Sequence, residues 1–103
     1  MYKLEFLPIV NSDLNNIINY IYQKTKVTTY GKKIVNTIMS EIDKILIFPY
    51  GNSIYNTCKK MKYEYRKIKV HNYLIFYNID EHKKIITIVR ILHEKMNLTE
   101  ILD

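Results

Sequence analysis

The chain has 103 residues and a formal net charge of +6, and 48% of its residues are hydrophobic, which argues against disorder and fits one domain over 1–103. It has a single cysteine, Cys58, so an intramolecular disulfide is excluded. No apolar run approaches the roughly 20 residues that span a membrane, and the first residues lack an export-signal pattern, so we expect a cytoplasmic protein without membrane contact.

The first predicted elements are a strand and a helix. The run 2–7 alternates and is ended by Pro8, which cannot donate to a β-ladder. Asn11 or Ser12 could cap the helix that follows, with Asp13 in its first turn near the positive end of the helix dipole. One apolar stripe then has helical spacing: Leu14, Ile17, Ile18 and Ile21.

A second predicted helix follows a polar turn and begins with Thr28 or Thr29 as its cap. Its apolar stripe is formed by Ile34, Ile38, Ile42, Ile45 and Leu46. The sequence Phe-Pro-Tyr-Gly at 48–51 ends it. Two helices of about 13 and 18 residues form a hairpin that cannot bury both stripes alone, so it must cover a sheet.

Three strands joined by short connections are predicted in the second half, at 63–70, 73–79 and 85–93. The fold class is therefore α+β with the order β-α-α-β-β-β, a mostly antiparallel sheet with a helical hairpin on one face. Period-two alternation places one set of side chains under the helices: Ile68, Val70, Ile75 and Ile79. A second set lies on the open face and gives it an aromatic and basic character: Tyr65, Lys67, Lys69, Leu74 and Phe76. The tail, 96–102, could add one helical turn.

Positive charge is concentrated in this second half. Residues 59–95 contain ten basic and four acidic residues, a surplus equal to the net charge of the whole chain. Such a pattern indicates either a surface that faces a polyanion or a solvated face that serves solubility. The candidate target-binding residues are Lys59, Lys60, Lys62, Tyr65, Arg66 and Arg90. The two arginines could contact phosphate or pair with Glu64 across the sheet, and Tyr65 could stack on a base or pack in the sheet.

No metal-ligand spacing, glycine-rich phosphate loop or nucleophile elbow occurs, so neither a metal nor another cofactor is expected.

Several segments together resemble the RelE/ParE superfamily of bacterial type II toxin–antitoxin toxins. They are DL..II.YI from Asp13, FPYGN, YRKIKV, NYLIFYNID and ITIVRILH, in family order over nearly the whole chain. The resemblance implies a growth-inhibiting toxin, as in plasmid stabilisation modules, neutralised by a cognate antitoxin. Its target would be either DNA gyrase, as for ParE, or messenger RNA on the ribosome, as for RelE. An inactive member that only binds antitoxin is a third alternative.

The resemblance also implies site residues. If the chain is an endoribonuclease, its catalytic candidates are Lys67, Lys69, His93 and Lys95. Leu74 stands where RelE-type chains carry an arginine, and Lys95 is the only cation after RILH, so the ParE alternative is preferred. His93 could serve as acid or base, or could fix the C-terminal turn by a backbone hydrogen bond.

Overall fold

The computed structural model describes residues 1–55 and 64–96. Its elements are β1 (Lys3–Phe6), α1 (Ile9–Thr25), α2 (Thr28–Ile47), a 3-10 turn (Pro49–Gly51), β2 (Arg66–Val70), β3 (Tyr73–Asp80) and β4 (Ile85–His93). The order of elements and the α+β class are those predicted. The predicted C-terminal helical turn lies almost wholly outside the described residues. No helix in the described ranges is long and apolar enough to cross a membrane.

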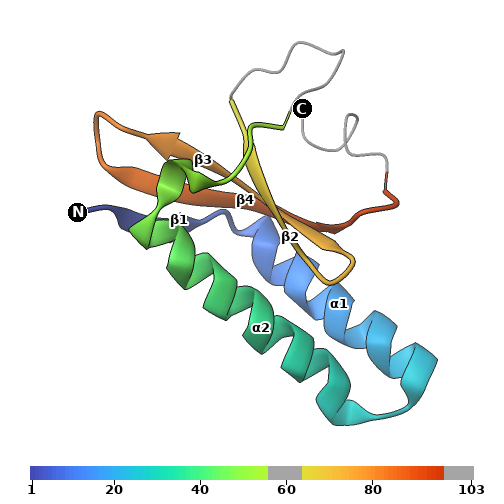
Figure 1. The fold of residues 1–103 in the computed structure, drawn as a ribbon. Coiled ribbons are helices and arrows are strands. Elements are labelled where there is room, and N and C mark those ends of the chain that lie inside the picture. Colours follow the sequence, from blue (N-terminus) through green and yellow to red (C-terminus); the bar gives the residue numbers. More distant parts are fainter. Residues whose placement is uncertain (56–63, 97–103) are drawn as a thin grey trace.

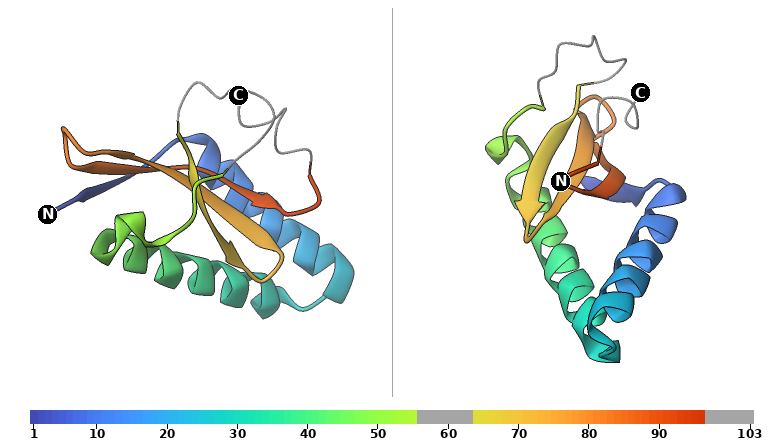
Figure 2. Two further views of the ribbon diagram at one scale, coloured as in Figure 1. Left: turned by 45° about the horizontal axis from the view of Figure 1, so that its top comes forward. Right: turned by 90° about the vertical axis from the view of Figure 1, so that its right-hand side faces the viewer.

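The four strands form one sheet in the order β1-β4-β3-β2, and both helices lie on the same face of it (Figure 1, Figure 2). β2, β3 and β4 pair antiparallel, as predicted, whereas β1 pairs parallel with β4, Lys3 opposite Ile85 and Phe6 opposite Ile88. The tight turns use left-handed backbone at His71 (φ 55°) and Lys84 (φ 57°).

Both predicted helix caps are wrong. α1 begins at Ile9, because Pro8 already has helical dihedrals (φ −55°, ψ −33°) and proline is suited to a helix start. α2 begins after the extended residue Val27, and no side chain caps it. Local preference for a hydroxyl or amide cap was thus overridden by the backbone that leads into each helix.

The main core lies between the helices and the sheet, and the predicted apolar stripes face it. Ile17, Ile38, Ile42 and Ile45 are buried there, with the other stripe residues Leu14, Ile21, Ile34 and Leu46 packed against them. The sheet contributes a matching set, with Ile68 and Ile79 partly buried: Ile68, Val70, Tyr73, Ile75, Tyr77, Ile79, Ile86, Ile88 and Ile91. The predicted assignment of faces is therefore confirmed.

The other face of the sheet differs from the prediction of an open surface. Its aromatic and apolar residues are buried in a second cluster: Tyr65, Leu74, Phe76, Val89 and Leu92. The ring of Tyr55 packs edge-on against Phe76, which is fully buried, with 5.2 Å between ring centroids. Of the predicted surface residues, Lys69 is exposed and Lys67 is half-buried.

A β-bulge in β4 allows that strand to serve both clusters. The register with β3 shifts between Phe76 and Tyr77, which pair with Arg90 and Ile88, so Val89 is the extra residue. As a result Ile88 and Ile91 join the main core, whereas Val89 and Leu92 join the second cluster.

Candidate functional site

The candidate site is built around a buried ion pair between α1 and β4. β1 stops pairing with β4 at Ile88, so the edge of β4 beyond that residue is covered by α1 instead. Asp13, only 4% exposed, accepts hydrogen bonds there from the Arg90 side chain (Nε 3.0 Å, Nη2 2.8 Å) and from the backbone N–H of Ile91 (3.0 Å). These hydrogen bonds, opposed by desolvation, raise the pKa of Arg90.

This ion pair shows which partner Arg90 has in the fold. Its guanidinium pairs with Asp13 and not with Glu64, so the alternative of a cross-sheet pair with Glu64 is wrong. A bidentate partner also leaves little of its charge for a phosphate. Asp13 is also not in the first turn of the helix, as was predicted, because α1 begins at Ile9. Its buried carboxylate instead accepts the hydrogen bond that a strand neighbour of Ile91 would otherwise accept.

A pocket of about 370 Å³ opens beside the ion pair, between α1 and the C-terminal end of β4. Its lining includes Ile17, Tyr20, Tyr73, His93 and Lys95. Aromatic and apolar side chains with a cation at one side are suited to an amphipathic polypeptide partner.

His93 is tied to the backbone at the end of β4. Its Nδ1 accepts a hydrogen bond from the N–H of Lys95 at 3.1 Å, and its ring lies edge-on to Tyr73 at 5.4 Å between centroids. The backbone hydrogen bond considered from the sequence is thus present. A neutral imidazole that accepts at Nδ1 carries its proton on Nε2.

The lysines named as catalytic candidates are partly brought together. Lys69 forms an ion pair with Glu94 at 2.8 Å, at the same end of the sheet as His93 and Lys95. The hydrogen bond from Lys69 lowers the pKa of Glu94. Lys67 lies two residues back along β2, with its Nζ 5.4 Å from the centre of the Tyr55 ring.

The remaining target-binding candidates have structural contacts or lie outside the described residues. Arg66 donates to the carbonyl of Asn52 at 2.7 Å, and its guanidinium lies 5.0 Å from the centre of the Tyr50 ring. Its expected partner Glu64 is 3.9 Å away and mostly exposed. Tyr65 is buried in the second cluster, in agreement with sheet packing. The lysines that fall outside the described ranges are Lys59, Lys60 and Lys62.

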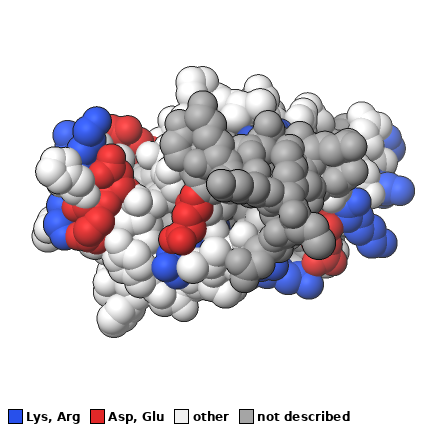
Figure 3. Space-filling model, turned by 90° about the horizontal axis from the view of Figure 1, so that it is seen from above, with Lys and Arg blue, Asp and Glu red and all other residues white. Residues whose placement is uncertain are grey.

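The described cations do not form one continuous basic surface. Lys69 and Lys95 lie where β3 begins, whereas Lys83 and Lys84 lie where β3 ends, eight residues along the strand or roughly 25 Å away. Viewed from above, red side chains lie beside blue ones at both ends of the molecule (Figure 3). The basic residues that the structure describes are therefore divided between the two ends of the sheet, and a surface facing a polyanion stays a prediction.

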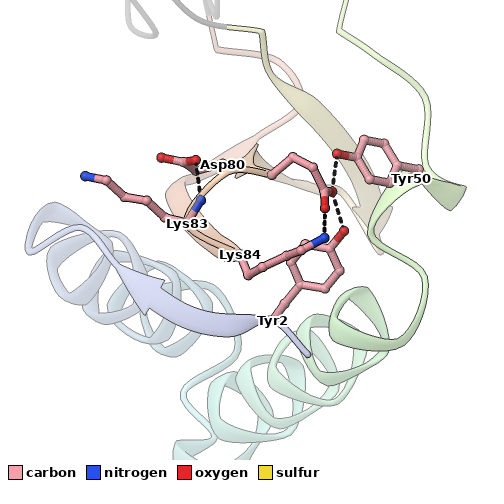
Figure 4. Close-up of polar contacts among 6 residues, drawn as sticks. Tyr2, Tyr50, Asp80, Lys83 and Lys84 are labelled. Atoms are coloured by element: carbon pink, nitrogen blue, oxygen red, sulfur yellow. Dashed lines mark hydrogen bonds and ion pairs between the residues drawn. The ribbon is translucent and has the colours of Figure 1, made fainter.

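Sequence reasoning also missed a polar cluster at the far end of the sheet, which we call the clasp: Tyr2, Tyr50, Glu81 and Lys84. Glu81 accepts hydrogen bonds from the Tyr2 and Tyr50 hydroxyls and pairs with Lys84 (Figure 4). At the start of the turn between β3 and β4, the Asp80 side chain accepts a hydrogen bond from the backbone N–H of Lys83. Desolvation raises the pKa of Tyr2, and the neighbouring Tyr50 raises it further.

The family model described as the ParE toxin of type II toxin-antitoxin system, parDE, matches residues 4–98, and the chain belongs to this family. No curated protein sequence matches the chain.

Two solved structures show the same fold. The chromosomal ParDE toxin–antitoxin system from P. aeruginosa matches with a TM-score of 0.70 at 16% identity, over 90% of this chain and 96% of that one. The archaeal RelE-RelB complex from Pyrococcus horikoshii OT3 matches with a TM-score of 0.56 at 11% identity, over 91% and 96%. At these identities the likeness concerns the fold.

Proposed function

We propose that this chain, as a toxin of a type II module, inhibits growth in the cytoplasm by poisoning DNA gyrase without cutting RNA. The match to the ParE family over 4–98 carries this proposal. The chemistry of the site supports it, because bidentate pairing occupies Arg90 and an ion pair occupies Lys69. Leu74, at the position of a RelE-type arginine, is buried in the second cluster.

One observation favours the alternative of ribosome-dependent cleavage of messenger RNA. Lys69, His93 and Lys95 converge at one end of the sheet, as an acid–base and phosphate-binding set would. Such a set needs a free cation to stabilise the charge on the pentacoordinate phosphate. With Lys69 paired to Glu94, that task would fall to Lys95 and Lys67.

The same proposal includes a cognate antitoxin. An acidic, apolar segment would place its side chains in the pocket beside Tyr20 and Tyr73, and its carboxylates near Lys95. Folding of a disordered segment on such a surface buries apolar area and satisfies charge together.

Induced expression in a bacterial host, followed by pulse-labelling, tests the target. We expect DNA synthesis to fall before protein synthesis, messenger RNA to remain uncut, and the purified chain to inhibit supercoiling by gyrase. The variants Lys67→Ala, Lys69→Ala and Lys95→Ala should remain folded and toxic. Lys32→Ala, at an exposed position of α2, is the matched control.

Each contrary result has a distinct meaning. Fragmented messenger RNA, with toxicity lost in the three lysine variants but kept in the control, would replace the gyrase proposal by the RelE-like one. A chain tolerated at high expression without antitoxin would be an inactive family member.

A further inference from the structure

The outer edge of β1 is an unpaired strand edge in the described structure. β1 is the first strand of the sheet, and its only strand neighbour there is β4 (Figure 1). The opposite edge differs, because β2 is bordered by residues 53–55, where the N–H of Lys67 donates to Ser53 and that of Tyr55 to Tyr65. An open edge presents backbone donors and acceptors that can pair with another strand.

The hydrogen bonds to β4 fix which groups of β1 point outward. The N–H of Lys3 donates to Lys84 at 2.8 Å and that of Leu7 to Ile88 at 3.0 Å. Backbone groups of alternate residues point to opposite sides of a strand. The N–H and C=O of Leu4 and Phe6 therefore point away from the sheet.

The edge is held in place before any partner arrives. The Leu7 bond fixes one end of β1, and the clasp fixes the other through the side chain of Tyr2. Beside the edge, Phe6, Leu7 and Ile9 are 40%, 42% and 44% exposed. A preorganised edge next to exposed apolar side chains lowers the ordering cost of association.

We propose that β1 pairs antiparallel with β1 of a second copy of this chain, with the two-fold axis at Leu4. In this register Leu4 exchanges both backbone hydrogen bonds with Leu4 of the partner, and Phe6 does so with Tyr2. Lys3 then stands opposite Glu5 of the partner, and Glu5 opposite Lys3. Both side chains are exposed, and the described structure gives neither of them an ion pair.

The sequence of β1 disfavours the other two-fold registers. Centring on Lys3 would place two ammonium groups opposite each other, and centring on Glu5 two carboxylates, and either is destabilising. Centring on Phe6 would bring Pro8 opposite Leu4, and Pro8 has no N–H to donate. The register at Leu4 is the one that pairs opposite charges twice, and it joins two four-stranded sheets into one.

Sedimentation of the purified full-length chain over a range of micromolar concentrations tests the proposal. We expect a monomer–dimer equilibrium. Lys3→Glu or Glu5→Lys should each weaken the dimer about tenfold or more, because each makes two like-charged pairs. The double variant Lys3→Glu/Glu5→Lys restores both opposite-charge pairs and should recover the wild-type dimer. Lys32→Glu, on α2, is the charge-matched control and should leave the dimer unchanged.

Disulfide cross-linking tests the proposed register of the two β1 strands. In the Cys58→Ser background, a mixture of Lys3→Cys and Glu5→Cys chains should form a disulfide-linked heterodimer with oxidised glutathione as the oxidant. Residues directly opposite in such a pair have Cα atoms about 4.5 Å apart, within disulfide reach. Each variant alone should remain uncrosslinked.

A chain that remains monomeric at every concentration overturns the proposal, and would leave the edge to a strand of another protein. A dimer that neither charge reversal weakens, or that the double variant fails to restore, overturns it as well. None of these outcomes depends on the toxin's target.

Discussion

Asp13 shows how one side chain can define the end of a sheet. Its carboxylate accepts from the backbone N–H of Ile91 and from two nitrogens of Arg90, so it completes a strand edge and neutralises a partly buried cation. An unpaired cation at such a site would have to be desolvated without compensation. The pair thus holds α1 against β4 and forms one wall of the pocket.

Replacing Asp13 by asparagine should lower the free energy of unfolding by about 2–4 kcal/mol, because the guanidinium of Arg90 loses its counter-charge. Urea denaturation of the purified variant measures this loss. Asp43→Asn removes the same charge from an exposed position of α2 and should change stability by less than about 0.5 kcal/mol. Equal midpoints for the two variants would show that the ion pair adds nothing to stability.

The sequence alone could not reveal this partnership. Asp13 and Arg90 are 77 positions apart, and a pattern of local spacing does not identify a partner at that distance. Local spacing predicts that Asp13, near the start of a helix, interacts with the helix dipole. It predicts that Arg90, in a mostly apolar strand, contacts either a phosphate or a residue on a neighbouring strand. By contrast, the backbone contact of His93 spans two residues, and it was among the alternatives that the sequence suggested.

The two helices approach each other closely where Gly31 of α2 faces Ile18 of α1. A Cβ atom added at Gly31 would lie 2.9 Å from the Cα and 3.3 Å from the carbonyl oxygen of Ile18. Both are backbone atoms, which cannot move away as the end of a flexible side chain can. Glycine is therefore required by the approach of the helices, although it weakens α2 as a helix.

Gly31→Ala should lower the free energy of unfolding by about 1–3 kcal/mol, because overpacking outweighs the gain in helix propensity. Thermal or urea unfolding followed by circular dichroism measures it. Ser40→Ala, exposed on the same helix, tests propensity alone and should be neutral or slightly stabilising. A Gly31→Ala variant more stable than wild type would mean that the helices separate at little cost.

The secondary structure elements were largely predictable, whereas their contacts were not. Alternation along 73–79 and helical spacing along 34–46 indicate which side chains lie between the helices and the sheet, and both assignments hold in the structure. The bulge at Val89 interrupts the alternation part-way along β4, and the run Ile-Val-Arg-Ile-Leu does not show which residue is extra. Burial of the second cluster depends on contacts such as that of Tyr55 with Phe76, between residues distant along the chain.

Three distant parts of the molecule are joined by the clasp. Tyr2 precedes β1, Tyr50 follows α2, and Glu81 and Lys84 belong to the turn between β3 and β4 (Figure 4). Glu81 is the common acceptor. Since β1 has only four residues and one strand neighbour, its attachment depends on contacts at its ends more than on its own ladder.

Glu81→Ala should increase local opening of β1, with a smaller effect on global unfolding. Hydrogen exchange at the amide of Lys3, which donates to Lys84, should be roughly three- to tenfold faster. His82→Ala, in the same exposed turn, keeps the clasp and should exchange at the wild-type rate. Unchanged exchange in the Glu81 variant would show that β1 is held by its backbone alone.

The parallel ladder between β1 and β4 also has a consequence for synthesis. Lys3 pairs with Ile85, so the first strand has no strand neighbour until the last strand of the sheet, β4, has been translated. Contacts between segments so distant in the chain form late and slowly. A nascent chain therefore cannot add β1 to the sheet before β4 has been synthesised, and until then the first strand stays without its ladder.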